Sequence, residues 1–198
     1  MNLANKLTIF RIILVPIMIV IPFFPIEGSL LGIPISAWII DFIFVIASIT
    51  DKLDGYIARS REQVTNFGKF LDPIADKVLV ISAMVMLVEM AKLPAWIPCV
   101  VIFREFIVSG YRLIAVENGG KVIAASVWGK LKTVTQMLAI TIAFLDVHAF
   151  GAVFQGGLTG WEFSINILTT GLMLISIIAT IFSGWDYIKN GKDLLKDR

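Results

Sequence analysis

Four aspartates in a short stretch of the chain carry the clearest sign of chemistry. Asp51 and Asp54 are three residues apart, and Asp72 and Asp76 are four residues apart. On an α-helix, either spacing places both carboxylates of a pair on one face. If the two helices that carry these pairs are antiparallel neighbours, their acidic ends meet and all four side chains converge.

Converging carboxylates repel one another and require compensating positive charge. Hard divalent cations prefer oxygen ligands, and Mg²⁺ commonly links carboxylates to substrate phosphates. Residues 51–76 contain no His or Cys that would favour zinc. A site of this size has room for two ions, which would hold a diphosphate during displacement. The alternative is that the aspartates are ordinary helix-end residues, with Asp72 as an N-cap before Pro73.

The elements that must position these aspartates are membrane helices. Of the 198 residues, 58% are hydrophobic and only 16% are charged, whereas a soluble domain usually has about a quarter of its residues charged. Residues 163–185 include no ionisable side chain. A run of this length can cross a bilayer core of roughly 30 Å as a helix that rises about 1.5 Å per residue.

We therefore expect an all-α, polytopic membrane protein in which residues 1–198 form a single domain. Backbone groups in lipid must bond within their own segment, so each span should be helical. The single cysteine, Cys99, is interpreted as a small buried hydrophobic residue. Six segments are expected to span the membrane: Ile9–Phe24, Ile33–Thr50, Ile74–Met90, Leu93–Val116, Trp128–Leu145 and Phe163–Trp185.

The basic residues predict the orientation of these spans. Residues 25–36 and 146–162 contain no Lys or Arg, and residues 89–98 contain only Lys92. Basic residues favour the cytoplasmic side of short loops. Both termini and the connection between the second and third spans should thus be cytoplasmic, which places the aspartates at the cytoplasmic face of the cell membrane.

The acidic stretch resembles the motif of the CDP-alcohol phosphatidyltransferases. The run Asp51-x-x-Asp54-Gly55-x-x-Ala58-Arg59, followed after eight residues by Gly68-x-x-x-Asp72-x-x-x-Asp76, matches every fixed position of that motif. The resemblance extends to the six-helix layout and so to most of the chain. It implies that all four aspartates ligate Mg²⁺ or Mn²⁺, that Asp76 also deprotonates the acceptor hydroxyl, and that the protein is a homodimer.

The same resemblance implies a set of contacts with the CDP part of a lipid substrate. The segment from Asn5 to Arg11 resembles the family segment that lines the nucleotide site. Taken alone, Asn5 and Thr8 would instead be interpreted as helix caps. The residues implied in CDP-lipid binding are Asn5, Thr8, Gly55, Ala58, Arg59, Thr65 and Gly68.

A second set of charges predicts the acceptor. Arg104 and Arg112 lie within the fourth span, where charge is costly and indicates a polar cavity. Lys130 and Lys132 begin the fifth span. Brought together in a cleft, these four cations would suit a phosphate dianion. The alternatives are ion pairs of Arg104 and Glu105 with neighbouring helices, snorkelling of Arg112, and lysines that bind lipid headgroups.

Both segments also resemble those of bacterial phosphatidylglycerophosphate synthases, the family members that use glycerol 3-phosphate. This resemblance implies transfer of the phosphatidyl group of CDP-diacylglycerol to sn-glycerol 3-phosphate, with release of CMP. Phosphatidylglycerol, inositol phosphate or serine as acceptor stays open, and so do a divalent-cation transporter and a non-catalytic scaffold. The only histidine, His148, falls in an expected external loop, which argues against a covalent phosphatidyl-enzyme.

Overall fold

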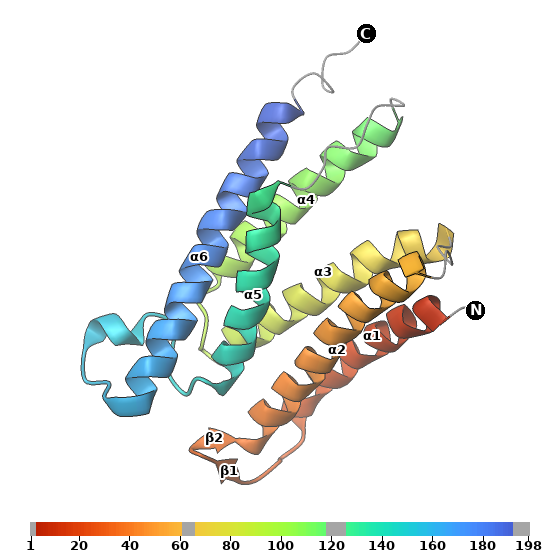
Figure 1. Ribbon diagram of the computed structural model, residues 1–198. Coiled ribbons are helices and arrows are strands. Elements are labelled where there is room, and N and C mark those ends of the chain that lie inside the picture. Colours follow the sequence, from red (N-terminus) through yellow and green to blue (C-terminus); the bar gives the residue numbers. More distant parts are fainter. Residues whose placement is uncertain (1–2, 61–65, 118–125, 192–198) are drawn as a thin grey trace.

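The computed structural model describes residues 3–60, 66–117 and 126–191, and the side chains of 5–51, 68, 71–115, 126–189 and 191. Within these ranges the protein is all-α, as expected. Helices α1–α3 and α4–α6 form two groups that meet at one end and diverge at the other (Figure 1). The helices are α1 (Leu3–Val20), α2 (Ile35–Ser60), α3 (Asn66–Glu89), α4 (Trp96–Glu117), α5 (Val127–Leu145) and α6 (Gly160–Asn190).

A small hairpin lies between α1 and α2. Its strands, β1 (Ser29–Leu30) and β2 (Ile33–Pro34), pair antiparallel, and short 3₁₀ turns lie at Ile21–Phe23 and Ala152–Gln155. Leu31 and Gly32 have φ values of 57° and 78°. Two consecutive positive φ values are the pattern of a type I′ turn, which suits a two-residue hairpin. The hairpin reverses the chain, so that α1 and α2 pack side by side as antiparallel neighbours (Figure 1).

The hydrophobic core joins the two helix groups near the end where they meet. Phe44 of α2 and Phe144 of α5 are both fully buried, and their ring centroids lie 6.2 Å apart. Such tilted aromatic pairs add to the free energy of burial. The same cluster includes Met18, Leu79, Leu87, Ile97, Ile140 and Met173. This packing leaves the C-terminal end of α2 and the N-terminal end of α3 at the diverging end of the bundle.

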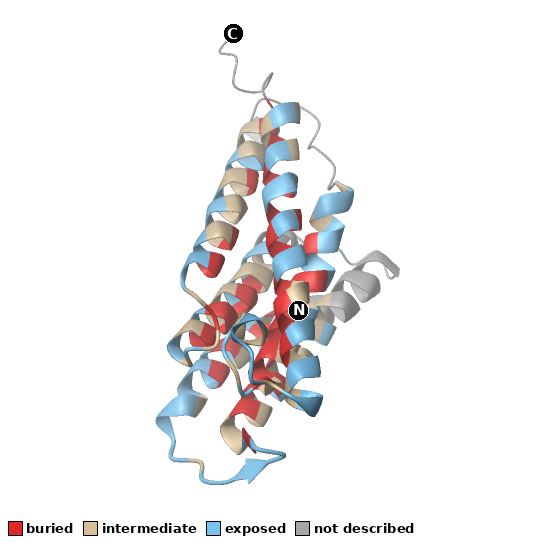
Figure 2. Ribbon diagram, turned by 90° about the vertical axis from the view of Figure 1, so that its left-hand side faces the viewer, coloured by how far each residue is buried: buried red, intermediate tan, exposed pale blue. Residues whose placement is uncertain are grey.

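The outer faces of the helices are apolar, and the interior holds many polar side chains. Figure 2 shows buried positions along the faces on which the helices meet and exposed positions on the outside. Phe103 and Phe106 of α4 are 70% and 73% exposed, whereas Arg11 and Asn166 are fully buried. Cys99 is also exposed, so its predicted burial is wrong. An apolar residue on an outward face is consistent with helices that contact lipid rather than water.

Among the residues that the structure describes, two helical segments can cross a bilayer by length and composition, namely Asn5–Phe23 and Gly160–Lys189. They correspond to the first and last of the expected spans. Each is near or above the roughly 20 apolar residues that a spanning helix requires. The first and last helices therefore have the properties of membrane spans.

The helices that carry the aspartates are longer than the apolar segments predict. Helix α2 continues to Ser60, so Asp51 and Asp54 belong to it, and α3 begins at Asn66. Asp72 is therefore not an N-cap, because Pro73 lies inside α3 rather than at its first position. Proline suits a first turn but can also occur within a helix at the cost of one hydrogen bond.

A buried polar network fixes the connection between α5 and α6. The Asn166 amide donates to Asp146 Oδ2 at 2.9 Å and to the Ala149 carbonyl at 3.0 Å, and its oxygen accepts from the Val153 N–H at 2.8 Å. Nearby, Lys92 Nζ donates to the Phe144 carbonyl at 2.7 Å. Burial lowers the pKa of Lys92, while the charges of Asp146 and Asp41 oppose that shift.

Replacement of Asn166 with Leu should destabilise the protein without impairing its chemistry. Three hydrogen bonds are lost and the buried Asp146 loses a donor, which should lower the free energy of unfolding by about 3 kcal/mol. Thermal unfolding in detergent measures the effect, with Ser164→Ala on the exposed side of the same helix as the control. Equal melting temperatures for the two variants would contradict the expectation.

Candidate active site

Helix α1 links the two acidic helix ends. Arg11 Nη1 lies 2.8 Å from Asp51 Oδ1 on α2, and Thr8 Oγ1 donates to Asp72 Oδ1 on α3 at 2.7 Å. Thr8 and Arg11 are three residues apart, so they share one face of α1. One aspartate of each pair is thereby held at the same turn of α1. Neither Asn5 nor Thr8 is a helix cap, because both lie inside α1.

Arg11 was predicted only as part of the segment that lines the nucleotide site, and its pairing with Asp51 was missed. Its side chain is fully buried, and its Nε also donates to the Ala47 carbonyl, one turn before Asp51, at 3.3 Å. A buried charge inside an apolar helix is costly unless it is paired and hydrogen-bonded. That cost was the available signal, because Arg11 lies within the first expected span and needs an anionic partner.

Asp76 lies one turn beyond Asp72 on α3 and is partly buried. The charges that act on it belong to Asp51 and Arg11 on one side of the site and to Lys132 and Glu105 on the other. Asp76 is therefore within electrostatic reach both of the Arg11–Asp51 ion pair and of a second charged cluster. A carboxylate located between the two clusters is suited to accept a proton from a substrate group that is bound there.

The second cluster is built around Glu105 of α4. Its Oε1 accepts from Arg104 Nη1 at 2.7 Å and from Lys132 Nζ at 2.8 Å. Lys77 of α3 lies 3.9 Å from Glu105 Oε2 and donates to Ser109 Oγ. Three helices thus each bring at least one cation to a single carboxylate. Lys77 was not predicted, although it directly follows Asp76 in the sequence.

Helix α6 closes the other side of this cluster. Arg112 donates to the Tyr187 hydroxyl at 2.8 Å, and the guanidinium carbons of Arg104 and Arg112 lie 5.9 and 5.6 Å from the Tyr187 ring centroid. Arg104 also donates to Ser183 Oγ. Gly184 leaves room for the Arg104 side chain, because a Cβ there would lie 3.3 Å from Arg104 Cγ and would require a small shift.

The acidic side chains present fit a hard divalent cation by their chemistry. Asp51 and Asp72 each use Oδ1 for Arg11 or Thr8, and a carboxylate retains further acceptor capacity after one such bond. Among the side chains that the structure describes, no three His, Cys, Asp or Glu residues group closely enough to hold a metal ion. Asp54, the fourth expected ligand, has its side chain outside that description.

Several predicted site residues cannot be placed by their side chains. Gly55, Ala58 and Arg59 lie within α2, but outside the residues whose side chains are described, and Thr65 lies outside the described residues altogether. Gly68 is buried in α3, and Asn5 is buried in α1. Their predicted contacts with a CDP group stay predictions.

Lys130 does not share the position of Lys132. Lys130 is exposed and Lys132 is buried. Two residues along an α-helix turn the side chain by about 200°, so the two lysines face different directions. Four cations were expected at an acceptor phosphate. Arg104 and Lys132 both pair with Glu105, and Arg112 lies near Arg104 because both contact Tyr187. Lys130 points away from this cluster.

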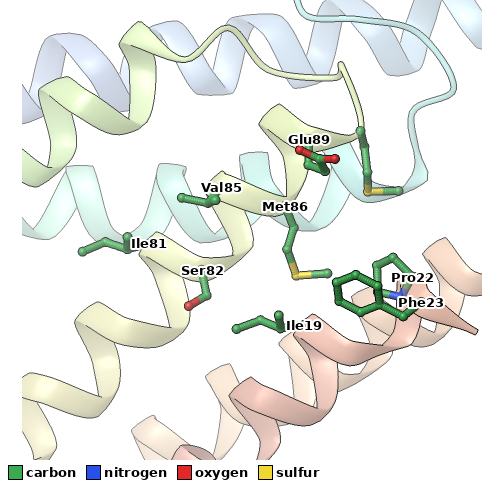
Figure 3. A pocket seen from close by; sticks show the side chains of 9 residues that line it. Ile19, Pro22, Phe23, Ile81, Ser82, Val85, Met86 and Glu89 are labelled. Carbon is green, nitrogen blue, oxygen red and sulfur yellow. The ribbon is translucent and has the colours of Figure 1, made fainter.

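A groove between α1 and α3 lies apart from the charged clusters. It has a volume of about 480 Å³ and is lined mainly by apolar side chains, including Ile19, Phe23, Val85 and Met86 (Figure 3). Its ionisable lining residue is Glu89, at the far end of α3 from Asp72. With neither the aspartates nor the cations on its walls, this groove is not the candidate site.

The architecture and the acidic helix ends agree with comparisons to known proteins. The family model for CDP-alcohol phosphatidyltransferase matches residues 1–183. The chain belongs to this family. A CDP-diacylglycerol–glycerol-3-phosphate 3-phosphatidyltransferase of Bacillus subtilis is 39% identical over 200 residues, which cover 98% of this chain and 97% of that protein.

Two further relatives bear names of the same kind of enzyme. A protein of the same name from Haemophilus influenzae is 40% identical over 202 residues, which cover 99% of this chain and 96% of that one. A probable phosphatidylglycerophosphate synthase of Mycobacterium tuberculosis is 36% identical over 187 residues, with 94% and 80% covered. This CDP-alcohol phosphatidyltransferase therefore matches relatives along nearly its whole length.

Within this phosphatidyltransferase, the ion-pair alternative for the fourth span accounts for part of the geometry. Arg104 and Glu105 do pair, and Lys132 joins them from α5. The prediction of a phosphate site and the ion-pair alternative are compatible, because the cations outnumber the single carboxylate at their centre. The cluster holds Lys77, Arg104, Arg112 and Lys132 around Glu105 and Tyr187.

Proposed function

We propose that the protein transfers the phosphatidyl group of CDP-diacylglycerol to sn-glycerol 3-phosphate, giving phosphatidylglycerol phosphate and CMP. The names of the Bacillus subtilis and Haemophilus influenzae relatives support this reaction. The observation that carries the choice of acceptor is the excess of positive charge around Glu105. Such an excess favours an acceptor with its own phosphate over a neutral alcohol.

The catalytic steps follow from this chain's own side chains. Asp76 accepts the proton of the acceptor hydroxyl, and the acceptor oxygen forms a bond to the phosphorus next to diacylglycerol. The bond from that phosphorus to the phosphate oxygen of CMP breaks, and CMP leaves with the electron pair. Two divalent cations, Mg²⁺ or Mn²⁺, bound by Asp51, Asp54, Asp72 and Asp76 would neutralise the diphosphate charge.

Substrate binding is divided between the two clusters. The CDP part of the lipid lies against Asn5 and Thr8 of α1 and the motif residues Gly55, Ala58, Arg59, Thr65 and Gly68. The acceptor phosphate lies against Arg104, Arg112 and Lys132, whereas Lys130, which was also predicted there, faces away from this cluster. The separate contacts of Arg11 with Asp51 and of Lys132 with Glu105 support this division.

The proposed setting is the cell membrane, with six transmembrane helices and the active site at the cytoplasmic face. The apolar outer faces of the helices and the scarcity of Lys and Arg in residues 25–36 and 146–162 support this topology. Both termini are then cytoplasmic, residues 1–198 form one catalytic domain, and the protein assembles as a homodimer. Diacylglycerol chains enter from the bilayer while both polar substrates arrive from the cytoplasm.

A CMP-release assay in detergent tests the proposed reaction. With CDP-diacylglycerol present, glycerol 3-phosphate should give the highest rate among glycerol 3-phosphate, phosphatidylglycerol, inositol phosphate and serine. A chelator should reduce that rate by on the order of a hundredfold or more, because metal ions contribute several kcal/mol to transition-state stabilisation. Excess Mg²⁺ or Mn²⁺ should restore it.

Other outcomes of this assay would contradict parts of the proposal. A preference for inositol phosphate or serine would overturn the choice of acceptor, and full activity in the chelator would overturn the metal. Divalent-cation flux into liposomes without any CMP release would favour a transporter instead.

A further inference from the structure

We propose that Glu105 is the positioning residue of the acceptor-phosphate subsite, holding Lys77, Arg104 and Lys132 in one group before the acceptor arrives. The inference rests on the proposed function, since it concerns the acceptor of that reaction. Glu105 does not touch the substrate in this scheme. It acts through the cations that do.

The geometry gives Glu105 a place that no other described carboxylate has. Its Oε1 is shared by Arg104 of α4 and Lys132 of α5 at 2.7 and 2.8 Å, and Oε2 faces Lys77 of α3 at 3.9 Å. Long cationic side chains lose considerable conformational entropy when they are held in place. A carboxylate that orders them in the free enzyme removes that cost from substrate binding.

Burial makes the carboxylate necessary. The side chains of Arg104, Glu105 and Lys132 are only 12%, 13% and 10% exposed. Like charges repel more strongly in a protein interior than in water, because the effective dielectric constant is lower. Without Glu105, the cations would move apart, and the acceptor phosphate would have to reassemble them.

The cluster still retains capacity for an anion when Glu105 is charged. Lys77, Arg104, Arg112 and Lys132 are four cations against two carboxylates, Glu105 and the nearby Asp76, so the local charge remains positive. In the part of the chain that the structure describes, the buried Nε of Arg104 has no hydrogen-bond partner. Asp76, the proposed base, interacts electrostatically with Lys132 and Glu105, so a phosphate bound here lies within electrostatic reach of that base.

The alternative role for Glu105, competition with the acceptor phosphate for the same cations, predicts a different effect on acceptor binding. If the carboxylate merely competed with the acceptor phosphate for the cations, its neutralisation would tighten acceptor binding. If it positions the cations, neutralisation weakens that binding. The sign of the change in KM for glycerol 3-phosphate therefore separates the two roles.

The variant Glu105→Gln keeps the size of the side chain and removes its charge. We expect the KM for glycerol 3-phosphate to rise about tenfold, the effect of losing one charge-assisted hydrogen bond, with the KM for CDP-diacylglycerol within about twofold of wild type. Glu162→Gln is the matched control, because Glu162 also pairs with a basic side chain, His148, at the other end of the bundle.

A double-mutant cycle with Lys132→Gln tests whether Glu105 acts through its cations. The effects on the KM for glycerol 3-phosphate should be clearly less than additive, because either single change already disrupts the shared pair. Glu105→Asp retains the charge on a shorter side chain and should recover part of the affinity. This variant also provides the KM if thermal unfolding in detergent shows that Glu105→Gln does not fold.

The outcomes separate this inference from the proposed function. Absence of CMP release by the wild-type protein with glycerol 3-phosphate would overturn the function. An active wild type with an unchanged or lowered KM in Glu105→Gln would overturn the positioning role alone. Equal rises in the KM of both substrates, or additive effects in the cycle, would also overturn it.

Discussion

Asp76→Asn should abolish CMP release while CDP-diacylglycerol still binds. The amide has almost the size of the carboxylate but cannot accept the proton of the acceptor hydroxyl. Loss of a general base alone costs about 10²- to 10⁴-fold in rate. Asp76 is also a proposed metal ligand, so we expect the loss to reach the upper end of that range.

Two measurements on this variant separate chemistry from binding. The rate of CMP release reports turnover, and titration with CDP-diacylglycerol reports affinity, which should change by less than about tenfold for a lost single interaction. Glu89→Gln is the control, because Glu89 is an exposed carboxylate on the same helix. Near-normal turnover in Asp76→Asn would refute the assignment of the base.

Arg11→Gln should lower kcat/KM by about a hundredfold, because small displacements of catalytic groups have effects of this size. The fully buried guanidinium holds Asp51 at 2.8 Å and also bonds to the Ala47 carbonyl on the same helix. Without it, Asp51 loses its cation while its repulsion with Asp76 remains. The free energy of unfolding should fall by about 2 kcal/mol, below the usual cost of breaking a fully buried pair because Asp51 is partly exposed.

Lys6→Gln is the matched control for Arg11→Gln. Lys6 lies on the same helix and carries the same charge, but it is exposed. Kinetics and thermal unfolding of both variants in detergent separate the loss of a positive charge from the loss of the Asp51 contact. Kinetic constants that agree between the two variants would rule out a role for Arg11 in placing Asp51.

The number and order of the helices could be predicted from the sequence, because apolar runs of sufficient length are local features. Their ends could not be predicted as well. Helix α2 runs through Asp51 and Asp54 to Ser60, beyond its apolar segment. Lys, Leu, Ala and Arg in residues 51–60 are good helix formers and offset the lower helix propensity of Asp and Gly. The start of α3 at Asn66 was obscured by Pro73, which suits a first turn equally well.

The two acidic pairs could be predicted from their spacing, but their partners could not. Which residue of α1 faces Asp51 depends on the rotation and depth of each helix, and these follow from packing across the bundle. The contacts of Arg11, and of Lys77 with Ser109, join residues far apart in the chain. The burial of Cys99 was mispredicted for a related reason, since hydrophobicity does not separate the inward from the outward face of a helix that is apolar on both.

The pairing of Arg104 with Glu105 has a consequence for biogenesis. The two residues are neighbours in the chain and bond to each other at 2.7 Å, whereas Lys132 comes from the following helix. During insertion of the proposed membrane helices, α4 therefore presents a neutralised pair to the bilayer before α5 has been synthesised, which reduces the penalty for its charges. Lys132 has no acidic neighbour in its own helix. The penalty for inserting its charge is therefore lowest if α5 enters the membrane beside an α4 that is already in place.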